Sequence, residues 1–199
     1  MTAIDRKKEL RAWYSPGPEP ELVVLPELGY LMIDGAGDPN TAPAYTAAVQ
    51  ALYASSYGIR KRVADETGRT YVVMPLEGLW WVPDMTRFTT SAKSEWQWTM
   101  MILQPHETTA GIADAAIADA IERKGVTSGV RLEQLTEGRC AQVMHHGPYA
   151  EEGPTIERLH AFIAAEGLSL GGHHHEIYLS DPRKCAPERM RTIIRQPVE

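Results

Sequence analysis

Residues 133–149 read EQLTEGRCAQVMHHGPY, a pattern typical of a β-strand that contains one glycine and ends in a Gly-Pro turn. Residues 22–37 read LVVLPELGYLMIDGAG and show the same features, with Gly29 in the place of Gly138 and more glycines at the end. A helical pattern and two further strand patterns follow each stretch. The order strand, helix, strand, strand is therefore predicted to occur twice.

In the first copy, turn residues lead into a helix that has Pro43 in its first turn and either Asn40 or Thr41 as its cap. Two predicted strands follow, RTYVVMPL (69–76) and EWQWTMMIL (95–103). The helix is predicted from an apolar stripe at helical spacing, formed by Tyr45, Ala48, Val49, Leu52 and Tyr53.

In the second copy, a helix is predicted to begin near Pro154 and to end at Gly167. The strands HHEIYLSD (174–181) and RMRTIIR (189–195) follow it. Both copies close on Gln-Pro, which strengthens the interpretation as a duplication.

An alanine-rich segment separates the copies and is predicted to form a helix over residues 110–124. Thr108 or Thr109 can cap its start, and Gly125 can end it.

These elements predict an α+β fold made of a duplicated β-α-β-β repeat, with an antiparallel sheet, helices on one face and a cleft between the repeats. Neither half buries enough surface alone, so we expect a single domain over residues 1–199. Its first repeat covers about residues 20–106, the linking helix covers 110–124, and the second repeat covers about 130–199.

Composition and charge exclude several classes of function. The chain has 199 residues, a net charge of −6 and a pI of about 5.7, which disfavours direct binding of nucleic acid. It contains no apolar run of membrane-spanning length and no secretory signal, so we expect no membrane partner and a cytoplasmic location. Two cysteines form no CxxC pair, and no cofactor motif is found. The sequence leaves the oligomeric state open.

The run GGHHHEIYLSD (171–181) resembles a metal site, but strand geometry argues against one. Side chains alternate along a strand, so His173 and His175 point to one face while His174 and Glu176 point to the other. The run cannot surround one ion, and no zinc-motif spacing is present. We therefore predict no metal.

Glu176 is the main candidate for a functional carboxylate. A carboxylate in the middle of a strand loses water, which is costly unless a partner compensates it. The sequence leaves three partners open: a tyrosine or tryptophan hydrogen bond, an arginine such as Arg191 or Arg195, or a cationic ligand. Burial among aromatic side chains predicts a raised pKa for Glu176.

The aromatic content favours a ligand site, because the chain has 5 Trp and 8 Tyr but only 2 Phe. Trp and Tyr carry a polar edge and attract flat or cationic molecules, and Met adapts to varied shapes. The predicted ligand-contacting residues are Met74, Glu77, Trp80, Trp81, Trp98, Met100, Tyr149, Glu176 and Tyr178.

Four stretches carry a family resemblance: MPLEGLWW (74–81), EWQWTMMILQP (95–105), HHGPYAEEGPTIERLHAFI (145–163) and HEIYLSDPRKCAPERMRTIIRQPV (175–198). With the duplicated order, they resemble the GyrI-like small-molecule-binding superfamily over roughly residues 20–199. The resemblance is to stand-alone members of a superfamily that also supplies the effector-binding domains of multidrug-responsive bacterial regulators.

This resemblance implies a cleft that binds lipophilic, aromatic and often cationic compounds, with Glu176 at the matching acidic position. Some stand-alone members are similar to hydrolases that open the cyclopropane ring of DNA-alkylating natural products. On that resemblance Glu176 and Tyr149 are the catalytic candidates, and Trp80, Trp81 and Trp98 shape the cleft. Another branch inhibits DNA gyrase by protein contact.

Three functions therefore stay open at this point. The first is a module that binds small molecules, and the second is a hydrolase in which Glu176 takes a proton from attacking water while Tyr149 or Tyr178 donates one. The third is an inhibitory protein-binding module of the gyrase-inhibitor type.

Overall fold

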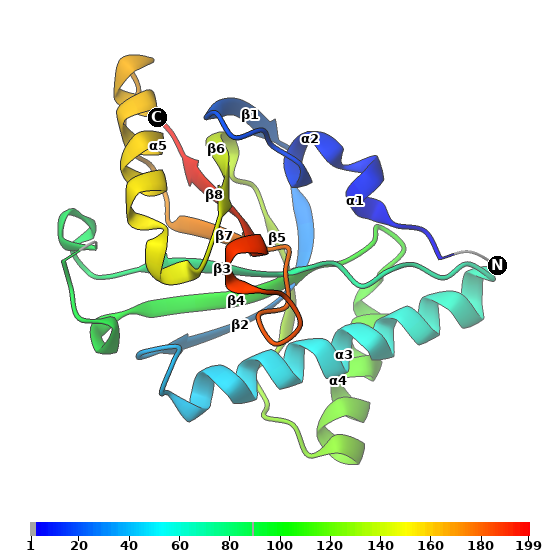
Figure 1. The fold of residues 1–199 in the computed structure, drawn as a ribbon. Coiled ribbons are helices and arrows are strands. Elements are labelled where there is room, and N and C mark those ends of the chain that lie inside the picture. Colours follow the sequence, from blue (N-terminus) through cyan, green and yellow to red (C-terminus); the bar gives the residue numbers. More distant parts are fainter. Residues whose placement is uncertain (1–2, 89) are drawn as a thin grey trace. The chain divides into compact units, whose positions relative to one another are not determined.

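The computed structural model describes residues 3–88 and 90–199 (Figure 1). Residues 1, 2 and 89 lie outside the described residues. All three fall within the expected domain, and residue 89 also falls within the expected first repeat. The chain divides into two compact units. The first unit takes in residues up to Arg6, Leu28–Leu76 and Trp81–Leu135, and the second takes in Lys7–Glu27, Glu77–Trp80 and Thr136–Glu199.

The first unit contains three antiparallel strands, β2 (Leu28–Ala36), β4 (Gln97–Leu103) and β5 (Arg131–Leu135). β2 pairs with β4 on one side and with β5 on the other. The register places Leu31 opposite Ile102, and both side chains are buried, so the central pair of strands presents apolar side chains to the core.

Two helices, α3 (Pro43–Thr67) and α4 (Ala110–Lys124), pack against each other in this unit, and α3 also packs against β2 and β4 (Figure 1). The Thr109 side chain caps α4 by accepting a hydrogen bond from the backbone N–H of Ile112. Gly125 ends α4 in the left-handed conformation that glycine tolerates. Both ends of the linking helix are therefore as predicted.

The second unit contains β1 (Glu21–Leu25), β6 (Gly138–His146), β7 (His174–Tyr178) and β8 (Arg191–Pro197), together with the main part of β3 (Leu76–Trp81). The strands follow the order β1-β6-β8-β7-β3. The pairs β1–β6, β6–β8 and β7–β8 are antiparallel.

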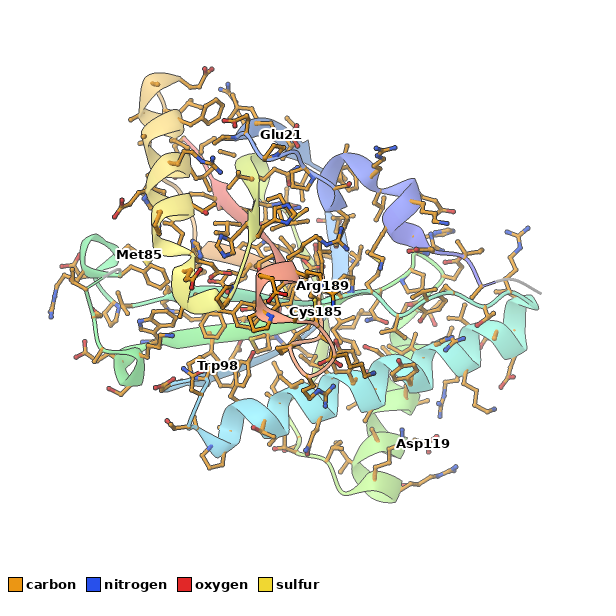
Figure 2. All side chains as sticks on the ribbon, in the orientation of Figure 1. Glu21, Met85, Trp98, Asp119, Cys185 and Arg189 are labelled. Carbon is orange, nitrogen blue, oxygen red and sulfur yellow. The ribbon has the colours of Figure 1, made fainter. Side chains whose placement is uncertain are left out.

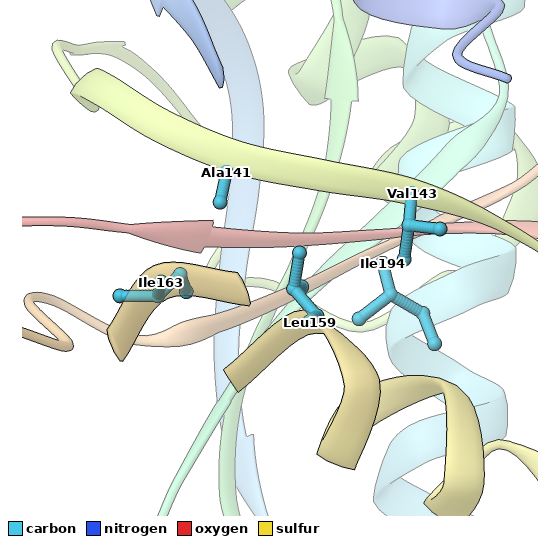
Figure 3. Close-up of a cluster of buried hydrophobic side chains, with 5 residues drawn as sticks. All are labelled: Ala141, Val143, Leu159, Ile163 and Ile194. Carbon is cyan, nitrogen blue, oxygen red and sulfur yellow. The ribbon is translucent and has the colours of Figure 1, made fainter. Parts of the chain in front are cut away.

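Helix α5 (Gly153–Ala165) covers one face of this second sheet. Figure 3 shows the apolar cluster that joins them, with Ala141 and Val143 from β6, Ile194 from β8, and Leu159 and Ile163 from α5. All five side chains are almost fully buried. Burying one large aliphatic side chain stabilises a fold by about 1.5–3 kcal/mol, so this cluster fixes α5 on the sheet.

Two short helices, α1 (Arg6–Glu9) and α2 (Arg11–Tyr14), precede β1. Short 3₁₀ turns cover Met85–Arg87, Lys93–Glu95, Tyr149–Glu151 and Pro187–Arg189. Figure 2 shows the side chains, with Trp98 on β4 and with Cys185 and Arg189 in the segment before β8.

The predicted fold class is confirmed: the chain is α+β, and the order β2-α3-β3-β4 recurs as β6-α5-β7-β8. The prediction of single strands over 22–37 and 133–149 is wrong, because each stretch forms two strands. Pro26, which has no N–H to donate, follows β1, and Gly138, with a φ of 68°, begins β6. The extra strands β1 and β5 pair with β6 and β2, respectively.

The strand predicted over 69–76 is also wrong, because Tyr71 forms only an isolated bridge with Ile4 and the strand runs over Leu76–Trp81 instead. The predicted cap of the first helix is wrong as well. Ala42 occupies the cap position, while the Asn40 side chain donates to Asp38 in the preceding turn.

Candidate functional site

Strand β7 separates two groups of polar side chains that lie on opposite faces of the second unit's sheet. Glu176 contacts His174 and Tyr178 at two-residue spacing, whereas His175 contacts a different set of residues. These contacts confirm the alternation that was predicted from strand geometry.

Glu176 accepts hydrogen bonds on both of its carboxylate oxygens. Tyr178 donates its hydroxyl to Oε2 at 2.8 Å, and His174 donates from Nε2 to Oε1 at 3.1 Å. Glu152, which is 5% exposed, also helps to lower the pKa of Glu176. Glu176 is 9% exposed, so it is largely, but not completely, shielded from water.

Aromatic rings continue this hydrogen-bonded chain. The indole N–H of the buried Trp80 donates to the Tyr178 hydroxyl oxygen at 3.0 Å, so Tyr178 receives one hydrogen bond and passes one on to Glu176. Tyr149 meets the Tyr178 ring edge-on, with 5.4 Å between ring centroids, and is itself exposed. Together they place a nearly buried carboxylate near the exposed ring of Tyr149.

The expectation of a raised pKa for Glu176 is wrong. Burial acts to raise the pKa, but the hydrogen bond and positive charge of His174, the hydrogen bond from Tyr178 and the smaller effect of Glu152 outweigh it. The pKa of Glu176 therefore lies below its ordinary value, and the group is an ionised carboxylate near neutral pH.

The opposite face of β7 carries a sealed charge network. His175 is completely buried, and its Nδ1 lies 2.9 Å from Oε1 of Glu137 while its Nε2 lies 3.0 Å from Oε2 of Glu77. Because both ring nitrogens meet carboxylates, the ring is best satisfied as an imidazolium that donates twice.

Arg195 and Tyr14 complete this network. Arg195 lies 3.3 Å from Glu137 and donates to the backbone oxygen of Trp13 at 2.7 Å, while Tyr14 donates to Glu77 at 2.6 Å. The network therefore attaches α2 to the sheet through both a side chain and a backbone carbonyl.

The pKa shifts agree with this arrangement of charges. Burial acts to raise the pKa of Glu137, but His175 and Arg195 outweigh it and bring the pKa to about 2. Burial also acts to lower the pKa of His175, but Glu137 and Glu77 outweigh it, and the pKa of His175 is raised.

Arg195 is not the partner of Glu176, although the sequence left that pairing open. Its guanidinium binds Glu137, Gln142 and the Trp13 carbonyl on the other face. Arg191 has the same strand parity as Arg195, which directs it away from the face of Glu176. The hydrogen-bonding partners that compensate Glu176 are instead His174 and Tyr178.

The structure brings four of the predicted site residues together: Trp80, Tyr149, Glu176 and Tyr178. Glu77 belongs to the same unit but joins the network around His175. The other four predicted ligand-contacting residues belong to the first unit and stay predictions: Met74, Trp81, Trp98 and Met100.

Within the first unit, Trp98 lines a cavity of about 320 Å³ together with Ile33, Asp34 and Arg131. Its indole lies where a Cβ on Gly35 would stand, so only glycine fits at position 35. Met74 and Met100 are buried, and the Trp81 indole N–H donates to Gln97 at 3.0 Å.

Sequence reasoning missed Glu152 and Glu137 as members of these groups. Glu152 lies in an acidic pair directly before Gly153-Pro154, where a helix was predicted to begin. The sequence therefore showed an acidic residue at a helix start, but it showed neither the burial of Glu152 nor its neighbours. Glu137 sits in the turn between β5 and β6, which had been interpreted as the interior of one strand.

Across residues 3–88 and 90–199, no group of three or more His, Cys, Asp or Glu side chains is arranged to hold a metal ion. In the same part of the chain, no helix is both long enough and apolar enough to cross a membrane.

Comparison with known proteins adds a family and several structural relatives. A model of the GyrI-like small molecule binding domain matches residues 18–199. No curated protein matches the chain.

Among solved structures, an uncharacterized conserved protein from Listeria innocua is 40% identical over 98% of this chain and 100% of its own, with a TM-score of 0.90. A hydrolase from the same organism is 39% identical over 98% of this chain and 100% of its own, with a TM-score of 0.85. The EcmrR C-terminal domain is 13% identical over 91% of this chain and 97% of its own, with a TM-score of 0.54, and it shares the fold alone.

Proposed function

Because the chain belongs to the GyrI-like small-molecule-binding domain family, we propose that it binds a lipophilic, aromatic and often cationic molecule beside Glu176 and hydrolyses it when it carries a strained, electrophilic ring. One observation carries the proposal: an ionised, nearly buried carboxylate is held by His174 and Tyr178 next to aromatic rings.

Binding follows from the surroundings of Glu176. The aromatic rings of Tyr149 and Tyr178 offer apolar surface and negative ring faces, which attract flat and cationic molecules. Because the pKa of Glu176 is lowered, its carboxylate keeps its charge near neutral pH and adds a direct attraction for a cation. Partial exclusion of water strengthens that attraction.

Hydrolysis follows from the same carboxylate acting as a base. Glu176 removes a proton from a water molecule, and the water oxygen forms a bond to a ring carbon of a cyclopropane-bearing substrate. The carbon–carbon bond of the ring breaks, and its electron pair moves to a conjugated oxygen that then takes up a proton. A positioned base contributes about 10²–10⁴-fold to such a rate, and ring strain lowers the barrier that remains.

The relatives support chemistry as well as binding. The hydrolase from Listeria innocua covers nearly the whole of this chain at 39% identity. The EcmrR C-terminal domain is only 13% identical, so its similarity supports the fold alone.

Turnover is tested by incubating the protein with a cyclopropane-bearing DNA-alkylating compound in H₂¹⁸O and measuring the water adduct by mass spectrometry. Wild type should form an ¹⁸O-labelled, ring-opened product, and Glu176→Gln should slow its formation by about 10²-fold or more. Glu188→Gln, an exposed change in the segment before β8, is the matched control. Equal rates for wild type and Glu176→Gln would show that the Glu176 carboxylate takes no part in the reaction.

A second candidate function is binding without chemistry, and the lowered pKa of Glu176 favours it because a weaker base suits a cation site better than proton removal. A cationic dye, rhodamine 6G, distinguishes the two. Saturable dye binding that Glu176→Gln weakens, with no labelled product from the alkylating compound, supports the binding module alone.

A further inference from the structure

The proposed hydrolysis needs a water molecule in a fixed orientation, and a carboxylate alone holds water in many orientations. The polar groups that contact Glu176 already use their hydrogen bonds. Tyr178 donates its hydroxyl hydrogen to Glu176 and accepts the indole N–H of Trp80, and His174 donates to the other carboxylate oxygen. A nearby group whose hydrogen-bonding capacity is not already used is better suited to orient the water.

Thr192 on β8 is such a group, and it lies on the same face of the sheet as Glu176. The register of β7 and β8 places Thr192 directly opposite Tyr178 and Ile194 directly opposite Glu176. Directly opposed residues of antiparallel strands share a face, as do residues two positions apart along one strand. Figure 3 shows Ile194 on this face, packed in the cluster with α5.

The Thr192 hydroxyl is completely buried and has no hydrogen-bond partner in the part of the chain that the structure describes. Its neighbour on the other side is His145 of β6, which lies opposite Thr192. Nδ1 of His145 lies 2.9 Å from the Thr155 hydroxyl oxygen, and its Nε2 lies 3.4 Å from the Pro148 carbonyl oxygen. Both ring nitrogens are therefore occupied by other groups.

A buried hydroxyl without a partner destabilises a fold, because it loses its hydrogen bonds to water and gains none in return. Buried polar groups are therefore almost always satisfied by the protein or by ordered water. The buried Thr99 on β4 follows this rule, since it donates its hydroxyl to Asp34 at 2.6 Å. The different situation of Thr192, beside the proposed base, points to a partner that is not part of the chain.

The distance across the strands suits a single water molecule. Thr192 opposes the residue two positions after Glu176, so the two are diagonal neighbours. The Cβ atoms of such neighbours lie roughly 7 Å apart. Two oxygens that share one bridging water lie at most about 6 Å apart, because each hydrogen bond is about 2.8 Å long. The register therefore allows one water molecule between the Thr192 hydroxyl and the Glu176 carboxylate.

We propose that Thr192 is a positioning residue that donates its hydroxyl hydrogen to the water molecule that Glu176 activates, an inference that rests on the proposed hydrolase function. The water donates one hydrogen to Glu176 and accepts one hydrogen bond from Thr192. Its remaining lone pair forms the bond to the ring carbon of the substrate while Glu176 takes the proton. Thr192 keeps its own hydrogen throughout, so it orients the water and leaves the proton balance unchanged.

This role affects the chemical step and not the binding of the organic molecule. A water molecule held by two groups is already oriented when the substrate arrives, which lowers the entropic part of the barrier. Thr192 adds no contact to the substrate itself. Loss of its hydroxyl should therefore lower kcat while KM and the affinity for a cationic dye stay close to those of wild type.

The test compares Thr192→Val, which keeps the shape of the side chain without the hydroxyl, with Thr192→Ser, which keeps the hydroxyl. Turnover of the cyclopropane-bearing compound in H₂¹⁸O and binding of rhodamine 6G are measured for each. Thr192→Val should lower kcat by about 10-fold or more, and Thr192→Ser should retain most of the activity. The matched control is Ser55→Ala on α3, which removes another buried hydroxyl without a partner among the described residues and should match wild type.

A second measurement depends neither on activity nor on the fold of a variant. A high-resolution crystal structure of the wild-type protein should show a water molecule about 2.8 Å from both the Thr192 hydroxyl and a Glu176 carboxylate oxygen. A Thr192 hydroxyl bonded to a protein group instead would overturn the positioning role.

The kinetic outcomes separate this inference from the proposed function. If wild type turns the compound over and Thr192→Val does so equally fast, the role of Thr192 is wrong and hydrolysis stands. A raised KM with unchanged kcat in Thr192→Val would mean that Thr192 contacts the ligand, which also overturns the role. Wild-type protein that binds the dye but forms no ¹⁸O-labelled product would refute the hydrolase function itself.

Discussion

The two faces of β7 carry similar residue types but differ in their access to water. On the sealed face, two carboxylates meet an imidazolium and a guanidinium, and the side chains of Glu77, His175 and Arg195 have no exposed surface. On the other face, Glu176 is 9% exposed and accepts hydrogen bonds from His174 and Tyr178, and Tyr149 nearby is exposed. A balanced, dry network holds structure together, whereas a carboxylate beside exposed aromatic surface suits binding and chemistry.

Replacement of Arg195 should produce the largest loss of stability. Arg195→Met removes the guanidinium that faces Glu137 and leaves a buried carboxylate with one fewer cation. Losing one partner of a buried ion pair costs about 3–5 kcal/mol, which urea denaturation followed by circular dichroism measures. The exposed Arg191→Met on the same strand is the control and should change stability by less than about 0.5 kcal/mol. Similar losses from both variants would mean that the network does not stabilise the fold.

Stability should fall at both low and high pH because of groups on the sealed face of β7. We call these two parts of the profile the acid limb and the alkaline limb. The pKa of Glu137 is about 2, below its ordinary value of 4.5, so its contribution is complete above about pH 4.5 and is lost as the pH falls towards 2. At about 1.4 kcal/mol for each pKa unit, that loss is roughly 3 kcal/mol. The pKa of His175 is raised above 6.5, so its contribution is complete below pH 6.5 and is lost as the pH rises through the folded-state pKa.

Urea midpoints measured from pH 2 to pH 9 test both limbs. Glu137→Gln should flatten the acid limb and His175→Gln the alkaline limb. If the loss of stability at low pH remains in Glu137→Gln, other carboxyl groups cause that loss.

Among the substitutions in the two polar groups on β7, Glu176→Gln should have the smallest effect on stability, at most about 1 kcal/mol. The amide oxygen still accepts the Tyr178 hydroxyl, and the group lies outside the balanced network. The same urea titration measures it. A loss as large as that of Arg195→Met would mean that the two faces of β7 are equally structural, and the distinction between them would then be invalid.

Local patterns predicted much of the fold because periodicity and capping are local properties. The linking helix was predicted with its cap at Thr108 or Thr109 and its end at Gly125, and the structure has Thr109 and Gly125 there. The alternation of His175 and Glu176 followed from the pleat of one strand. The strand at 76–81 was missed because Val72 and Val73 gave residues 69–76 the stronger β pattern.

Partners that are distant in sequence could not be predicted from local patterns. His175 lies between Glu77 and Glu137, which are 98 and 38 residues away in the chain. The direction of the Glu176 pKa shift was wrong for a different reason. The groups that outweigh burial are mainly His174 and Tyr178, two residues away on the same strand, and Glu152 from another segment contributes less.

The order in which the strands are made has a consequence for folding during synthesis. The first unit contains no residue beyond Leu135, so its strands β2, β4 and β5 can pair while the remaining chain is still being translated. In the second unit, β1 is made early but its partner β6 appears more than a hundred residues later, and Arg195 arrives with the last strand. The apolar strand β1 therefore waits unpaired on the ribosome, where chaperone contact or a wrong pairing competes with the native one.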